Sequence, residues 1–224
     1  MIEFNFGKYS FSGILLAGGK SSRMKTQKAL LRLGGMTLLE RQIEKLKALG
    51  CDEIILSLAA EGAENFKVAE ESQVLQVRDL VAEAGPLAGL YSCLPRCRFP
   101  ALVISVDLPL LSVETLRGLL QAHLEAGNRD SGRLISRGKM PKATILRSHG
   151  VMEPLIGVYD PACGEICKNL IEGRGFETEK KPAVRALIQR LNCQFYEFTG
   201  DPRELLNCNS PEDFQQAKEF FSKA

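Results

Sequence analysis

The segment Ser12–Leu33 reads SGILLAGGKSSRMKTQKALLRL, and it joins a short apolar run to a cationic loop. The apolar residues have the length of a buried strand and end at the pair Gly18-Gly19. Six basic residues and no acidic residue fall between positions 8 and 32. Paired glycines let the backbone approach an anion closely, and the neighbouring cations neutralise its charge. The segment therefore predicts a phosphate-binding loop after the first strand, with a solvated basic face as the alternative.

Strand and helix patterns alternate along the first half of the chain. Apolar runs of strand length lie at 12–17, 53–58, 74–77 and 101–106, and helical patterns lie at 37–50, 62–70, 86–94 and 112–127. This alternation predicts an α/β fold with a mostly parallel sheet between two layers of helices. The alternation of strands and helices is less regular after residue 127. We expect strands at 134–137, 143–146, 153–159 and 194–198. We expect helices at 161–172, at 182–191 and from 210 onward. A length of 224 residues suits a single domain over 1–224.

Composition and charge exclude several classes of protein. The net charge of +2 leaves no basic surplus outside the first loop, so we expect no nucleic-acid partner. No apolar run approaches the roughly 18–20 residues of a membrane span, and the first residues lack a signal-peptide pattern. We therefore expect a cytoplasmic protein with no membrane partner. The seven cysteines are expected as free thiols; the pairs at 93 and 97 and at 163 and 167 are either packing residues or a weak metal motif.

Two aspartates follow expected strands. Asp107 comes directly after the run at 101–106, and Asp79 follows the run at 74–77. Ligands of open α/β sheets bind beyond the carboxyl ends of the strands, where the first loop also lies. A carboxylate facing a cationic loop suits Mg²⁺ bound to phosphates, because Mg²⁺ takes only one or two protein carboxylates. The alternatives are that Asp107 caps a turn before Pro109 and that Asp79 is an ordinary loop residue.

Five motifs occur in order along nearly the whole chain. They are LAGGKSSRMKTQK from Leu16, RDLVAEAGPLAGL from Arg78, SVDLPLL from Ser105, EPLIGVY from Glu153 and LLNCNSPEDF from Leu205. In order and spacing they resemble the motifs of the molybdenum cofactor guanylyltransferase family. The resemblance implies a three-layer, Rossmann-like nucleotidyltransferase fold, with 12–127 as the nucleotide-binding half and 128–224 as the acceptor-side half.

The resemblance also implies an activity and a set of site residues. The activity is Mg²⁺-dependent transfer of GMP from GTP to the phosphate of molybdenum-molybdopterin, which releases pyrophosphate and forms the guanine dinucleotide cofactor. GTP, molybdopterin and other molybdenum cofactor biosynthesis proteins would be the partners. Matched position by position, the implied roles are nucleotide binding by Leu16, Ala17, Gly18, Gly19, Lys28, Asp79 and Asp107, catalysis by Arg23, Lys28 and Asp107, metal binding by Asp107, and an acceptor-side position for Asn207 and Asn209.

The chain departs from the family pattern in three places. Lys25 replaces a glycine, Gln27 replaces the aspartate before the lysine, and Ser57-Leu58-Ala59 replaces a segment in which asparagine helps to recognise guanine. The third change leaves open a related nucleotidyltransferase that uses CTP or a sugar or polyol phosphate, and the first two leave open a non-catalytic nucleotide-binding homologue. Three further cations are candidates to meet the acceptor's phosphate, with a solvated loop as the alternative: Arg137, Lys139 and Lys142.

Overall fold

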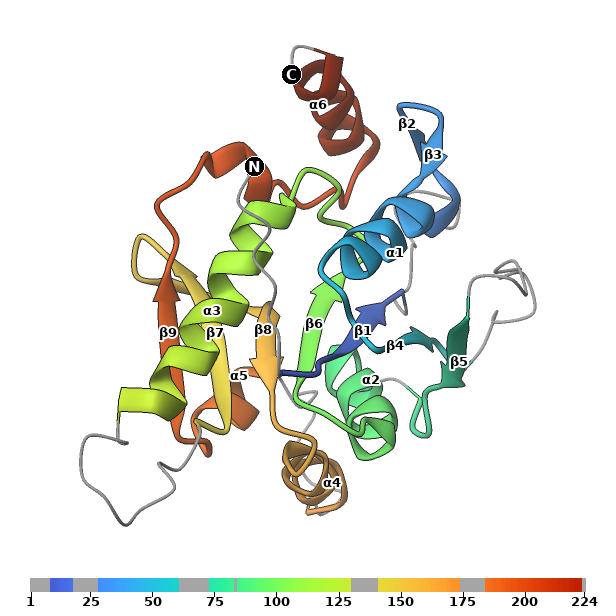
Figure 1. Ribbon diagram of the computed structural model, residues 1–224. Coiled ribbons are helices and arrows are strands. Elements are labelled where there is room, and N and C mark those ends of the chain that lie inside the picture. Colours follow the sequence, from blue (N-terminus) through green and yellow to red (C-terminus); the bar gives the residue numbers. More distant parts are fainter. Residues whose placement is uncertain are drawn as a thin grey trace.

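A seven-stranded sheet forms the centre of the protein, in the order β5-β4-β1-β6-β8-β7-β9 (Figure 1). The computed structural model describes residues 9–17, 28–60, 73–82, 84–129, 141–173 and 184–222. The strands of the sheet are β1 Ser12–Leu16, β4 Glu53–Leu58, β5 Val74–Arg78, β6 Ala101–Ser105, β7 Ala143–Ser148, β8 Val151–Tyr159 and β9 Cys193–Glu197. Strands β5, β4, β1 and β6 pair in parallel, β8 is antiparallel to both β6 and β7, and β9 is parallel to β7. Only β8 is reversed, so the predicted mostly parallel α/β sheet is confirmed.

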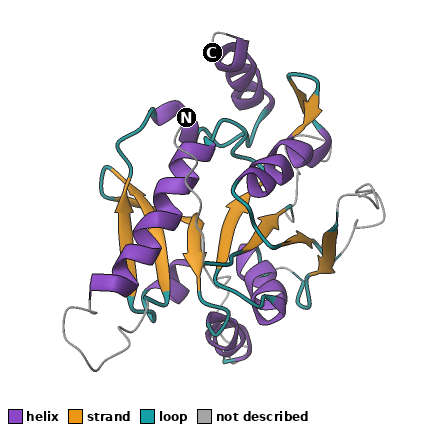
Figure 2. Cartoon of the chain, viewed as in Figure 1, coloured by secondary structure: helices purple, strands orange, loops and turns teal. Residues whose placement is uncertain are grey.

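Helices cover both faces of this sheet (Figure 2). Their bounds are α1 Leu38–Ala48, α2 Pro86–Cys93, α3 Val113–Arg129, α4 Cys163–Glu172, α5 Val184–Ile188 and α6 Pro211–Ser222, with short 3-10 helices η1 Lys28–Leu30, η4 Leu94–Arg96 and η6 Pro202–Leu205. One hydrophobic cluster lies between the sheet and α1, α3 and α6, and a second lies between the sheet and α2, α4 and α5. The three-layer arrangement that the sequence predicts is therefore present.

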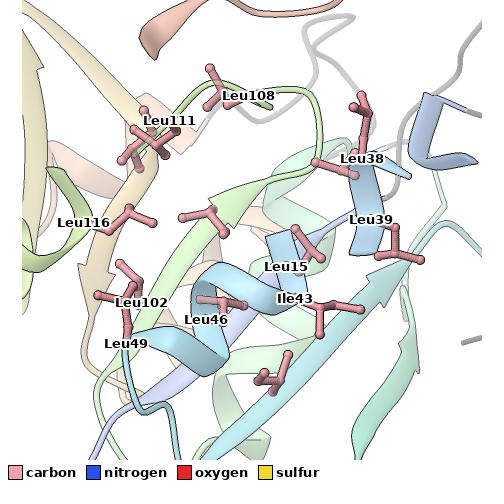
Figure 3. Close-up of a cluster of buried hydrophobic side chains, with 14 of the residues drawn as sticks. Leu15, Leu38, Leu39, Ile43, Leu46, Leu49, Leu102, Leu108, Leu111 and Leu116 are labelled. Atoms are coloured by element: carbon pink, nitrogen blue, oxygen red, sulfur yellow. The ribbon is translucent and has the colours of Figure 1, made fainter. Parts of the chain in front are cut away.

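Helix α1 begins and packs as its sequence predicts. The Thr37 hydroxyl accepts a hydrogen bond from the Glu40 amide at 3.1 Å, and the Glu40 carboxylate accepts one from the Thr37 amide at 2.7 Å. This capping box satisfies two amides that a helix start leaves without intrahelical partners. The apolar face of α1 then packs over β1 and β6, where Leu46 and Leu15 lie in one cluster with Leu102 (Figure 3).

The second half of the chain differs more from the prediction. The pairing of β7 with β8 shifts from Ile145↔Gly157 to Leu146↔Glu153, so β8 bulges between these points. The buried Tyr159 hydroxyl donates to the Pro154 carbonyl at 2.6 Å and supplies a partner within the bulge. Helix α5 is shorter than the expected helix at 182–191, a small hairpin of β2 Arg32–Leu33 and β3 Met36–Thr37 was not predicted, and the elements expected at 62–70 and 134–137 lie outside the described residues.

The cysteines contribute to packing. All seven are free thiols, and Cys93, Cys97, Cys163 and Cys167 lie in the hydrophobic cluster beneath α2 and α4. Burial raises the pKa of the Cys93 and Cys167 thiols to about 12, so they remain protonated at neutral pH. Among the described residues, none of the helices combines the length and the apolar character that crossing a membrane requires.

Candidate functional site

Asp107 lies in the turn that follows β6, at the carboxyl edge of the sheet. The amide of Val106 donates to the Leu16 carbonyl at 3.1 Å, so this turn begins beside the end of β1. One carboxylate oxygen of Asp107, Oδ1, is buried and has no hydrogen-bond partner within the described part of the chain. Buried polar atoms are usually paired, and a carboxylate oxygen with unused lone pairs is the ligand that a hard divalent cation prefers. This unpaired carboxylate oxygen therefore fits the role of one ligand of a metal ion.

The segment Asn207–Asn209 closes the site from the other end of the chain. The Cys208 amide donates to the Asp107 carbonyl at 2.8 Å, and the Lys28 ammonium donates to Asn209 Oδ1 at 2.7 Å. Two predicted site residues that are distant in sequence, Lys28 and Asp107, are thus both hydrogen-bonded to this one segment. In Figure 1 the end of β6, the β2–β3 hairpin and α6 all lie at the same edge of the sheet.

The start of α6 fixes the position of Asn209. Asp213 accepts hydrogen bonds from the amides of Asn209 and Ser210 at 2.9 and 2.8 Å, and the Ser210 hydroxyl accepts from the Asp213 amide at 3.2 Å. The backbone hydrogen bonds from Ser210 and Asn209 lower the pKa of the Asp213 carboxyl, so its charge is retained at neutral pH. The SPED sequence therefore forms a helix cap and also holds the backbone of Asn209, whose side-chain oxygen accepts from Lys28.

Asp79 and Ser57 form a second polar group at the same edge, after β5 and within β4. The Ser57 hydroxyl donates to Asp79 Oδ1 at 2.8 Å, and the Asp79 amide donates to the Leu58 carbonyl at 2.8 Å. Burial raises the pKa of the Asp79 carboxyl to about 6, and the hydrogen bond from Ser57 opposes this rise. A carboxyl group whose pKa is shifted toward neutral pH is common in binding sites.

We expect the Asp79→Asn variant to be more stable than the wild type at pH 8, and this gain to shrink as the pH falls through 6 toward 4. The pKa in the folded state lies above the unfolded value of 3.8. The folded protein therefore bears the cost of a half-buried charge above pH 6 and sheds it by taking up a proton below that value. Urea unfolding of both proteins at pH 8 and pH 5 measures the difference. An equal gain at the two pH values would contradict this interpretation.

Helix α2 supports the Asp79 turn through the GPLAG segment. Gly85 has φ +60°, which side-chain-bearing residues rarely adopt, and Pro86 occupies the first turn of the helix. The Ser92 hydroxyl accepts from the Leu80 amide at 2.8 Å and donates to the Ala88 carbonyl at 2.7 Å. The segment that follows Asp79 is thus tied to α2.

Gly89 sets how closely α2 approaches the sheet. A Cβ atom at this position would lie 2.6 Å from Ser57 Oγ and 2.8 Å from Leu16 Cδ2. Both distances are shorter than ordinary contacts, so these two buried side chains or the helix would have to shift. The last glycine of GPLAG is therefore required by the packing of α2 on β1 and β4.

We expect Gly89→Ala to lower the free energy of unfolding by about 1–3 kcal/mol, the usual cost of overpacking. The Ser57 hydroxyl would have to turn away, so Asp79 would also lose its donor. Urea unfolding measures the loss, and repeating the substitution in a Ser57→Ala background provides the control. The loss should be smaller there because the hydroxyl is gone; an equal loss in both backgrounds would show that Ser57 is not the obstacle.

The structure places most, but not all, of the predicted residues. Leu16 and Ala17 lie at the end of β1, where the Ala17 amide donates to the Ser57 carbonyl at 3.0 Å. Lys28, Asp107, Asn207 and Asn209 come together, while Asp79 stands with Ser57 along the same edge. The remaining predicted residues of the first loop, Gly18, Gly19 and Arg23, lie outside the described residues, as do Lys25 and Gln27.

One prediction about the acceptor is wrong for Lys142. This lysine precedes β7, which runs in the same direction as β6, so it lies at the opposite edge of the sheet from Asp107. Its ammonium pairs with Asp160 at 3.0 Å. Charge alone suggested a role, but strand direction places the residue away from the site. Arg137 and Lys139 lie outside the described residues.

Sequence reasoning missed two supporting residues. Ser57 was considered only as the replacement of a base-recognising asparagine, yet its side chain is 1% exposed and is used by Asp79. Asp213 was not considered at all, although it holds Asn209. The signal for Asp213 was present, because a serine followed three positions later by an acidic residue is typical of a helix start.

The model of the MobA-like NTP transferase domain matches residues 13–192, which is most of the chain. The chain belongs to the MobA-like NTP transferase family. A relative from Carboxydothermus hydrogenoformans, named "probable molybdenum cofactor guanylyltransferase", is 32% identical over 93% of this chain and 95% of its own. The family resemblance that the motifs indicated is thereby confirmed, and with it the assignment of the chain as a nucleotidyltransferase.

Solved structures support the same fold. Molybdopterin-guanine dinucleotide biosynthesis protein A from Archaeoglobus fulgidus superposes with a TM-score of 0.69 at 20% identity, over 95% of this chain and all of that protein. A Mycobacterium tuberculosis protein crystallised in complex with manganese superposes with a TM-score of 0.62 at 18% identity, over 94% of this chain and 98% of its own. At these identities the likeness establishes the fold of this family member and not its substrates.

Proposed function

We propose that this MobA-like transferase transfers GMP from GTP to the phosphate of molybdopterin, which yields the guanine dinucleotide cofactor and pyrophosphate. The observation that carries the proposal is the convergence of Lys28, Asp107 and the segment Asn207–Asn209 at one edge of the sheet. The name of the Carboxydothermus relative supports the choice of GTP and molybdopterin. The setting that we infer is the cytoplasm, with the proteins that supply molybdopterin as further partners.

The reaction is an in-line displacement at the α-phosphorus of GTP. An oxygen of the acceptor phosphate forms a bond to the α-phosphorus, and the bond to the bridging oxygen of pyrophosphate breaks. The attacking oxygen is already ionised at neutral pH, so no side chain has to remove a proton. The barrier comes from bringing two anions together, and the protein lowers it by positioning them and by compensating their charge.

Lys28 and Asp107 divide this task. We assign the Lys28 ammonium to holding the departing phosphates, together with Arg23 of the predicted phosphate-binding loop. Asp107 is the residue to hold a divalent cation, because its buried Oδ1 is without a partner in the described residues. Such a cation, which we propose to be Mg²⁺, supplies positive charge at the α-phosphate when it is bound. We assign Asp79 to contacts with the nucleotide, and Asn207 and Asn209 to the part of the site near the metal and the acceptor.

The test is pyrophosphate release from purified protein with GTP, molybdopterin and Mg²⁺. Release that requires all three components would support the proposal, and binding of GTP without release would instead favour a non-catalytic nucleotide-binding homologue. The base is tested separately by thermal unfolding with GTP, CTP, ATP and UTP, since a ligand of the folded state raises its stability in proportion to affinity. Ser57 makes this second test necessary, because its hydroxyl is buried and bonded to Asp79. A shift with CTP alone would favour a cytidine-directed enzyme.

A further inference from the structure

Helix α1 carries one polar residue on the face that packs against the sheet. Gln42 is 0% exposed and lies among the leucines of α1 that enter the hydrophobic cluster. Its amide nitrogen donates to the Leu108 carbonyl at 2.7 Å and to the Ser105 carbonyl at 3.3 Å. These two carbonyls stand on either side of Asp107 in the chain. One buried side chain therefore bridges both ends of the turn that presents the carboxylate.

Two further donors hold the same turn. One helical turn after Gln42, the Lys45 ammonium donates to the Pro109 carbonyl at 2.8 Å. From the other side, the Cys208 amide donates to the carbonyl of Asp107 itself at 2.8 Å. The carbonyls of residues 105, 107, 108 and 109 are thus all engaged by groups from outside the turn. We call Gln42 and Lys45 the α1 clamp.

The apolar side chains of the turn are anchored as well. Leu108 and Leu111 point into the cluster beside α1 and are 3% and 0% exposed (Figure 3). The turn is therefore fixed by packing on one side and by hydrogen bonds along its backbone, none of which uses the Asp107 carboxylate. A ligand that must meet a metal within fractions of an ångström needs support of this kind.

The presence of Gln42 at this position lowers the stability of the folded state, so packing alone does not explain why a glutamine stands there. The other polar atom of the Gln42 amide, Oε1, is buried and has no hydrogen-bond partner within the described part of the chain. A buried acceptor without a partner destabilises the folded state. Leucine or methionine would fill this apolar face without that cost. What Gln42 adds is a donor to the two carbonyls beside Asp107.

We propose that Gln42 is a positioning residue for the metal-binding carboxylate of Asp107, and that Lys45 assists it by holding the next part of the turn. The inference rests on the proposed function in one respect, namely that Asp107 binds a divalent cation. Gln42 itself touches neither substrate nor metal.

The test is Mn²⁺ binding in the presence of GTP and without acceptor, measured in electron paramagnetic resonance as the loss of the free Mn²⁺ signal beyond the loss that the same GTP causes without protein. The variant is Gln42→Met, which keeps the volume and removes the donor. We expect Mn²⁺ affinity to fall about 10-fold, as is typical when a residue that orients a metal ligand is lost. GTP affinity in the absence of metal should stay at the wild-type value, because Lys28 and its loop are unchanged. Mn²⁺ affinity equal to that of the wild type would overturn the proposal.

Matched variants separate positioning from packing. Ile43→Val alters the next residue of the same buried helix face without touching the turn, and it should leave Mn²⁺ affinity unchanged. Equal losses in Ile43→Val and Gln42→Met would overturn the proposal, because packing alone would then account for both. Lys45→Met should weaken Mn²⁺ binding in the same direction, and it carries the test if Gln42→Met does not fold; wild-type affinity in this variant would then overturn the proposal.

Asp107→Asn distinguishes this inference from the proposed function. If Mn²⁺ binding disappears in Asp107→Asn and the wild-type protein releases no pyrophosphate, the GMP transfer is refuted, while the α1 clamp is still judged by the Gln42→Met result. Pyrophosphate release with unchanged Mn²⁺ binding in Gln42→Met would refute only the clamp. A wild-type protein without an Asp107-dependent Mn²⁺ site would overturn the clamp directly.

Discussion

The Asp107→Ala variant is expected to transfer GMP about 10²- to 10³-fold more slowly than the wild type at saturating GTP and Mg²⁺, in line with the loss of other groups that stabilise transition-state charge. In the proposed reaction the Asp107 carboxylate holds the cation while two phosphate anions approach each other. Alanine leaves the turn in place, because the backbone contacts of Cys208 and Gln42 do not involve this side chain. Initial rates of pyrophosphate release provide the measurement.

Two controls bear on this result. Asp107→Asn keeps the shape of the side chain and removes the charge, so it should be nearly as slow as Asp107→Ala if charge is what matters. Asp160→Asn changes an aspartate at the opposite edge of the sheet, which pairs with Lys142, and should retain the wild-type rate. Near wild-type turnover of Asp107→Ala with Mg²⁺ present would exclude Asp107 as the metal ligand.

The second large effect is expected from Lys28→Met, which should weaken GTP binding or slow transfer by a combined factor of about 10 to 100, the range for one hydrogen bond to a charged group. The lysine is held at Asn209 in the absence of ligand, with its ammonium 2.7 Å from the amide oxygen. In the proposed reaction the same ammonium contacts the departing phosphates of GTP. Equilibrium binding and initial rates together show whether the loss falls on KM or on kcat.

Lys47→Met is the matched control for the lysine. Lys47 lies on the exposed side of α1 and pairs only with Glu44 at 3.1 Å among the ion pairs of the described residues. Removing it changes the net charge by the same amount without touching the site. If both variants lost affinity equally, the overall field of the protein and not a contact by Lys28 would be responsible.

The sequence predicted the first half of the fold better than the second. Strands β1, β4, β5 and β6 are short apolar runs, and the sequence predicted helices between them, such as the one that begins with the capping box at Thr37. Their order therefore implied parallel pairing. The bulge in β8 was not predictable, because it depends on a contact between Tyr159 and the Pro154 carbonyl that only the folded sheet brings about. The β2–β3 hairpin has only two residues in each strand, too few for a periodic pattern.

The sequence predicted those site residues whose chemical type and position in a motif, or after a strand, indicate a function. Asp107 and Asp79 follow apolar strands and were found from that position, and Lys28 was found from the family motif. Gln42 was not found, although a glutamine at 42 interrupts the apolar series 38, 39, 43 and 46 on one helix face. A polar residue on such a face is a signal, but what it bonds to depends on a turn more than 60 positions further along the chain.

The contact between Lys28 and Asn209 has a consequence for biosynthesis. The two residues are 181 positions apart, and the loop between them contains nearly every strand of the sheet. Ribosomes add about 5–20 residues per second, so the parallel strands exist for several seconds before Asn209 has been made. A nascent or truncated chain that stops before Asn209 would contain the parallel strands and the Asp107 turn. It would lack the residue that accepts a hydrogen bond from Lys28. Incomplete translation products are thus expected to sequester little GTP, because the last segment to be made is the one that completes the site.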